Sequence, residues 1–217
     1  MVALLLKTRE ETANYKNQFS TLEKLRYIDS LLLSPGRNKL FLLQGNLMKA
    51  NTLLELGQES QAIQLLEQLL TEVGPSDRRS VMRSLVMSYM RLAERTNCVM
   101  NHASESCIMP IRGLGIHVLT QGSRKAINLY SELLMDNPGD LESRWLLNIA
   151  YMTLGEYPGG VPSDFLIPGL DRDTIVSIKP FTDIAGNLGI DTYSMAGGSI
   201  LEDFDNDGYI DLVTSGW

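Results

Sequence analysis

Apolar residues recur at the spacing of an α-helix through much of the first 157 positions. In the stretch STLEKLRYIDSLLL, one helical face carries Leu22, Leu25, Ile28, Leu31 and Leu32. The stretch SPGRN follows, and its Pro35 and Gly36 predict the end of this helix. The pattern therefore predicts an amphipathic helix that buries one of its sides.

Three later stretches share one set of offsets between small and bulky residues. They are Ala50, Leu53 and Gly57, then Val86, Tyr89 and Ala93, and then Asn148, Tyr151 and Gly155. After the first and second stretches, Ala62 and Leu66 are matched by Ala126 and Tyr130. Such internal repetition predicts helix pairs that stack on one another. The alternative is a helical bundle in which these spacings have no meaning.

These offsets resemble the tetratricopeptide repeat, a helix pair of about 34 residues. Leu53 and Tyr89 lie 36 positions apart, whereas Tyr89 and Tyr151 lie 62 apart. The resemblance therefore implies a tetratricopeptide-like domain over residues 1–157, with an insertion at about 98–125. Repeat arrays of this kind expose a long concave face, which implies a peptide or protein partner.

The composition changes near Pro158. The whole chain has a net charge of −7, but residues 158–217 hold ten acidic and two basic side chains. This balance argues against nucleic acid as a partner, and no apolar run is long enough for a membrane span. The Pro- and Gly-rich segment 158–180 predicts a linker that caps the helices. After it, TIVSI, GGSILEDF and YIDLVTSG have strand-type residues.

Acidic residues crowd the stretch LEDFDNDGYIDLVTSGW near the end of the chain. Asp203, Asp205, Asp207 and Asp211 stand at positions 1, 3, 5 and 9 of a loop, with Gly208 at position 6 and the Tyr209 carbonyl at position 7. Oxygen ligands in this spacing favour Ca²⁺. The position that an EF-hand gives to glutamate holds Thr214, and the flanks are strand-like. The alternative is a solvated acidic turn without an ion.

The loop resembles the calcium loop of FG-GAP repeats, also called VCBS repeats, found in integrin α-chain propellers. With the helical repeats, the chain is similar to exported bacterial proteins of the ASPIC/UnbV type. The resemblance implies a mostly α fold followed by the start of a β-propeller, with residues 181–217 as a truncated first blade. It also implies an N-terminal fragment of an extracellular or periplasmic protein, with no signal peptide visible in this chain.

The insertion holds both cysteines and both histidines of the chain: Cys98, His102, Cys107 and His117. Three interpretations stay open. The cysteines could form a disulfide, as exported proteins often do. They could be buried or unpaired thiols beside ordinary histidines. Finally, the four side chains could hold Zn²⁺ or a copper ion, or form a redox site.

Two functions follow from these patterns. The first is a non-catalytic, exported, calcium-binding scaffold that binds a peptide or protein on its helical repeats. The second is a metalloenzyme or redox protein whose site lies in the insertion, at residues 98–117. The sequence contains no G-x-S-x-G, glycine-rich phosphate loop or H-E-x-x-H pattern, so we predict no catalytic residue.

Overall fold

A computed structural model describes residues 2–17, 19–106, 108–172, 181–192 and 197–215. Contacts divide the chain into two compact units, Met1–Thr174 and Ile175–Trp217. The division falls within the segment 158–180, where the composition changes. We describe each unit by itself.

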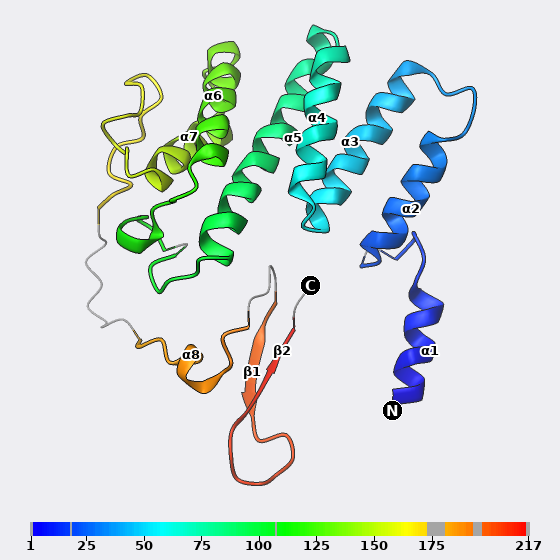
Figure 1. Cartoon of the computed structure of the whole chain (residues 1–217), viewed down its shortest axis with the longest axis vertical. Helices are drawn as coiled ribbons and strands as arrows, with labels where there is room; N and C mark the ends of the chain where they lie inside the picture. Colours follow the sequence, from blue (N-terminus) through cyan, green and yellow to red (C-terminus); the bar gives the residue numbers. More distant parts are fainter. Residues whose placement is uncertain (1, 18, 107, 173–180, 193–196, 216–217) are drawn as a thin grey trace. The chain divides into compact units, whose positions relative to one another are not determined.

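The first unit is helical. Its α-helices are α1 (Val2–Thr12), α2 (Thr21–Leu32), α3 (Lys39–Glu55), α4 (Glu59–Glu72), α5 (Pro75–Glu94), α6 (Gln121–Asp136) and α7 (Leu141–Thr153). From α2 to α7, each helix packs against the next one along the chain, and α3 also contacts α5 (Figure 1). The predicted mostly helical fold is confirmed. None of the described helices combines the length and apolar character that crossing a membrane requires.

The repeated positions lie in the core of this unit. The buried members of the pattern are Ala50, Leu53, Ala62, Leu66, Val86, Tyr89, Ala93, Ala126, Tyr130 and Asn148. Tyr151 is half-buried and packs against the same core. The shared offsets therefore mark the positions where neighbouring helices touch.

One position of the pattern decides where a helix ends. Gly57 and Gly155 follow α3 and α7 with φ angles of 68° and 67°, a left-handed conformation that glycine adopts readily. The second stretch has Ala93 at this position. There the chain continues as helix to Glu94 and then through a π-helical turn, Arg95–Val99. The absence of glycine thus agrees with the longer helix that leads into the insertion.

The first predicted helix is present as α2, but its apolar face is only partly covered. Ile28 is buried and Leu25 packs against the core, whereas Leu22 is 49% exposed. The reason is that α2 packs mainly against α3, and no described residue of α1 is buried. Gly36, with a φ of 79°, lies in the turn that ends α2 as predicted.

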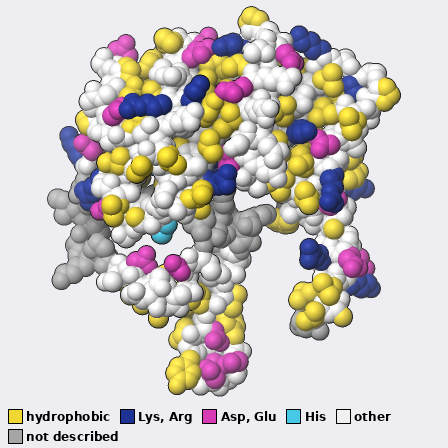
Figure 2. Space-filling model, viewed as in Figure 1, with side chains coloured by type: hydrophobic (Ala, Val, Ile, Leu, Met, Phe, Trp, Pro, Cys, Tyr) yellow, Lys and Arg dark blue, Asp and Glu magenta, His cyan; other side chains and the backbone are white. Residues whose placement is uncertain are grey.

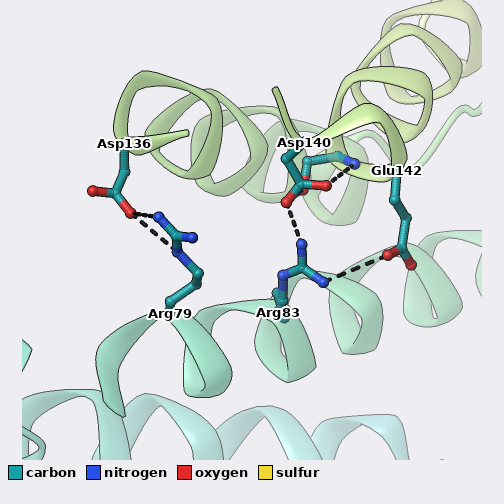
Figure 3. A network of polar contacts seen from close by, with 6 residues as sticks. Arg79, Arg83, Asp136, Asp140 and Glu142 are labelled. Atoms are coloured by element: carbon teal, nitrogen blue, oxygen red, sulfur yellow. Dashed lines mark hydrogen bonds and ion pairs between the residues drawn. The ribbon is translucent and has the colours of Figure 1, made fainter. Parts of the chain in front are cut away.

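Ion pairs join α5 to the turn between α6 and α7 (Figure 3). Arg79 pairs with Asp136 at the end of α6, and Arg83 pairs with Asp140 and lies 3.5 Å from Glu142. Most of these side chains are exposed, so each pair contributes little by itself. Asp140 differs because its side chain is only 6% exposed.

Asp140 is the N-cap of α7. Its carboxylate accepts hydrogen bonds from the backbone N–H of Ser143 at 3.2 Å and from the Ser143 hydroxyl at 3.0 Å. Burial would raise the pKa of Asp140, but the Ser143 hydrogen bonds and the Arg83 guanidinium outweigh it and lower the pKa. The start of α7 is therefore fixed by a charged side chain that α5 helps to neutralise.

No helix follows α7 in the described part of the first unit; an irregular segment covers it instead. The Arg144 guanidinium donates to the carbonyls of Phe165 at 3.1 Å and Leu166 at 2.7 Å. The side-chain amide of Asn148 donates to the Phe165 carbonyl and accepts from the N–H of Ile167. These bonds satisfy the backbone of a segment that makes no regular structure.

In its described residues, the second unit contains a short helix and one hairpin. Helix α8 (Ala185–Leu188) precedes β1 (Ser199–Glu202) and β2 (Asp211–Thr214), which pair antiparallel from Ser199 opposite Thr214 to Glu202 opposite Asp211. The predicted strands at GGSILEDF and YIDLVTSG are therefore present. TIVSI lies outside the described residues, and a two-stranded sheet does not amount to a propeller.

We expect the helical unit to depend on its core leucines. Leu66→Ala should lower the free energy of unfolding by about 2–5 kcal/mol, because Leu66 is fully buried and its truncation leaves a cavity. Leu33→Ala is the control, since Leu33 is 85% exposed, and it should change stability by less than about 0.5 kcal/mol. Chemical denaturation followed by circular dichroism measures both. Equal effects of the two substitutions would contradict this packing.

Candidate functional site

The acidic loop joins the two strands of the hairpin. Asp203 directly follows β1, and Asp211 is the first residue of β2, so strand pairing brings the two ends of the loop together. The N–H of Phe204 donates to an Asp211 side-chain oxygen at 3.0 Å. Space-filling atoms show acidic side chains gathered at the tip of the hairpin (Figure 2).

The loop folds around the carboxylate of Asp203. One oxygen of this carboxylate accepts from the N–H of Asp207 at 3.1 Å, and the other accepts from the N–H of Gly208 at 2.9 Å. Asn206 and Gly208 have φ angles of 59° and 90°. Glycine adopts such a positive φ readily, and at Gly208 it turns the backbone back toward Asp203.

Three of the four predicted carboxylates come together. Oxygens of Asp203, Asp205 and Asp211 lie within 4.8 Å of one another, about twice a Ca²⁺–oxygen distance. No other group of three or more His, Cys, Asp or Glu side chains in the described residues is placed to hold a metal ion. These oxygens are hard ligands on a partly exposed loop, which suits Ca²⁺ better than Zn²⁺.

Asp207 and Tyr209 stand apart from this group. An Asp207 side-chain oxygen accepts from the N–H of Tyr209 at 2.9 Å, so that carboxylate stabilises the turn. The Tyr209 side chain is 76% exposed. The assignment of the Tyr209 carbonyl as a ligand stays a prediction, as does the participation of Asp207.

The second predicted site lies between α5 and α6, and Asn97 in the π-helical turn fixes its base. The Asn97 amide nitrogen donates to the Leu119 carbonyl at 3.0 Å, and its oxygen accepts from the Leu119 N–H at 2.8 Å. The backbone N–H of His117 donates to the Thr153 carbonyl at 2.8 Å. The end of the insertion is thereby held against α5 and α7.

A buried polar chain runs inward from Cys98. The Cys98 sulfur lies 3.4 Å from Nε2 of His117, and Nδ1 of His117 lies 3.0 Å from the Ser123 hydroxyl. Ser123 in turn lies 2.9 Å from the hydroxyl of Thr153. All four side chains are buried. A neutral imidazole satisfies both neighbours with one donor and one acceptor nitrogen, whichever tautomer is present.

The surroundings of His117 keep its ring neutral. Burial lowers the pKa of His117 from its usual value of 6.5, and the charge of Glu94 opposes this shift only in part. Protonation would place a cation between a sulfur and a hydroxyl inside the protein. The site is therefore arranged for a neutral imidazole at pH 7.

The structure brings together only part of the predicted cysteine–histidine set. Cys98 and His117 are neighbours, whereas His102 lies on the surface. Cys107 lies outside the described residues, so the disulfide and the four-ligand metal site both stay predictions. Ser123 and Thr153 were not predicted. They lie 30 positions apart in different helices, and no local pattern connects them.

Comparison with known proteins adds no further assignment. No protein-family model matches the chain, and neither a curated protein nor a solved structure matches it.

We expect the free energy of unfolding to fall as the pH drops below about 6.5, through His117. The unfolded chain takes up a proton near pH 6.5, but the folded chain resists it to a lower pH because the folded pKa is lowered. The stability that His117 contributes is thus fully present above pH 6.5. It declines as the pH falls from 6.5 to the pKa of His117 in the folded protein. NMR titration of the His117 ring should give a midpoint below 6.5, and His117→Gln should flatten this part of the stability profile. A midpoint at or above 6.5 would contradict the buried environment.

Proposed function

We propose that this protein is a non-catalytic scaffold that binds calcium through the hairpin loop of its second unit. The observation that carries the proposal is the convergence of Asp203, Asp205 and Asp211 within 4.8 Å. Three carboxylates this close repel one another, and a divalent cation would replace that repulsion with attraction. Such an ion would also tie β1 to β2, which matters because an isolated two-stranded hairpin is marginally stable in water.

The helical unit supplies the binding surface in this proposal. Stacked helix pairs of the tetratricopeptide type present an extended face to a peptide or protein. The second unit would be the start of a propeller of the FG-GAP type. This loop would need calcium to hold its carboxylates together. An extracellular or periplasmic location fits that need, because calcium is abundant in those compartments. The ordered packing of α2 to α7 and the acidic hairpin support this combination.

Calcium binding is tested directly on the full chain by isothermal titration calorimetry. The double substitution Asp203→Asn with Asp205→Asn should weaken calcium binding at least about tenfold, or about 1.4 kcal/mol, because it removes two charges from the group. Asp191→Asn is the control, since Asp191 is an exposed carboxylate of the same unit outside the group. Absence of calcium binding to the unchanged protein, or equal loss in the control, would refute the calcium site.

A second candidate function rests on the contact between Cys98 and His117. Their 3.4 Å separation in a buried site is the arrangement from which a redox or soft-metal centre is built. The chemistry would then be carried by the insertion, and the helical unit would hold it in place.

The second candidate predicts bound zinc or copper, or a thiol that changes state with redox conditions. Metal analysis of the purified protein tests for bound zinc or copper, and thiol titration with and without reductant tests for a redox-sensitive thiol. His117→Ala combined with His102→Ala should abolish metal content if the site is real. A metal-free protein with the same thiol count in both conditions would leave only the scaffold function.

A further inference from the structure

A groove runs between α2 and α3. Its volume is about 460 Å³, within the range of sites that hold ligands. The lining comes from the segment before α2 and from both helices, and it includes Tyr15, Lys16, Lys24, Tyr27, Phe41 and Met48. These residues make it an apolar groove with a few polar side chains.

The floor of the groove exists because two helices approach closely. A Cβ atom on Gly45 would lie 2.6 Å from the Cδ2 atom of Leu32, so a larger residue at this position would push the Leu32 side chain aside. One wall is aromatic, because the rings of Tyr15 and Tyr27 stack with their centroids 3.9 Å apart. Met48 is 53% exposed and offers a flexible apolar surface. The groove can thus accept bulky apolar side chains.

The charges of the groove all have one sign. Lys16 and Lys24 are its only charged lining residues. Lys24 pairs with Glu55, outside the lining, and the Lys16 ammonium lies 6.0 Å from the centre of the Tyr15 ring. In contrast, a second groove is lined by Lys39 together with Glu72 and Asp77.

The third groove has two basic and two acidic lining residues. Its arginines, Arg78 and Arg79, are paired with Glu132 and Asp136, which line the same groove. Of these three grooves, the α2–α3 groove alone is lined by basic residues and by no acidic residue.

We propose that the α2–α3 groove binds an amphipathic peptide helix whose apolar residues are flanked by acidic ones. The proposal rests on the peptide-binding role proposed above for the helical unit and specifies its place and partner. Apolar side chains one turn apart would enter between Tyr27 and Phe41, as in other helix-in-groove complexes. An acidic side chain at the rim would meet Lys16, which has no carboxylate in the lining. Apolar contact supplies affinity, and Lys16 selects the sign of the flanking charge.

The test uses a fluorescein-labelled helical peptide with leucines at i, i+3, i+4 and i+7 and glutamates elsewhere. Its counterpart carries lysine at every glutamate position. Fluorescence anisotropy with the full chain should show the acidic peptide binding at least about tenfold more tightly than the basic one. Lys16→Glu and Met48→Glu should each weaken binding of the acidic peptide about tenfold. Lys16→Glu should also reduce the difference in affinity between the acidic and the basic peptide.

Matched controls separate the groove from a general charge effect. Lys125→Glu and Met135→Glu make the same changes on exposed positions of α6, outside the groove, and should leave the affinity within about twofold. Equal affinity for both peptides, or equal effects of groove and control substitutions, would overturn the proposal. Light scattering gives a further outcome: a wild-type dimer that Met48→Glu converts to a monomer would assign the groove to a second copy and also overturn it.

The same measurements distinguish this inference from the calcium proposal. Peptide binding is measured in calcium and in chelator, while calorimetry on the hairpin variants reports calcium independently. A peptide that binds without responding to Lys16→Glu or Met48→Glu would remove this groove and leave a peptide-binding helical unit intact.

Discussion

Close approach between neighbouring helices is the constraint on which the first unit depends. A Cβ atom on Gly122 would lie 2.8 Å from the Tyr89 carbonyl and 2.9 Å from the Cβ of Ala93, so α5 and α6 touch through a hydrogen and a methyl group. Ala50 and Ala126 are fully buried in the same way. Because dispersion contacts weaken quickly with distance, small side chains here let the larger ones interdigitate. A larger side chain at any of these positions would push the two helices apart at that contact.

The helical pattern could be predicted from the sequence because it depends on local spacing. Offsets such as those of Leu53 and Tyr89 identify a face of a helix, and that face is buried in both cases. Exposure of Leu22 could not be predicted, since it depends on what lies beside α2 and not on α2 itself. The same holds for the segment held by Arg144 and Asn148, where side chains replace a missing helix.

The two candidate sites differ in how far the sequence reveals them. The acidic loop is contiguous, so hairpin pairing alone brings Asp203 and Asp211 together. The buried chain in the insertion depends on tertiary structure: His117 meets Ser123 of α6 and contacts Thr153 of α7 through its backbone. Their proximity in the sequence groups His102 with His117, but His102 is exposed and His117 is buried. The hydroxyls of Ser123 and Thr153 complete this series of buried polar contacts, and no spacing in the sequence distinguishes them from other serines and threonines.

The paired hydrogen bonds between Asn97 and Leu119 have a consequence for how the chain tolerates change in length. They close the insertion at its base, so the segment between them is a loop whose ends are already joined. The entropy of closing a loop grows only with the logarithm of its length, at about 0.6 kcal/mol per doubling. A lengthened or shortened tip would therefore leave the register of α6 on α5 undisturbed. The tip beyond this base is therefore a permissive position in the fold, where new segments could be grafted.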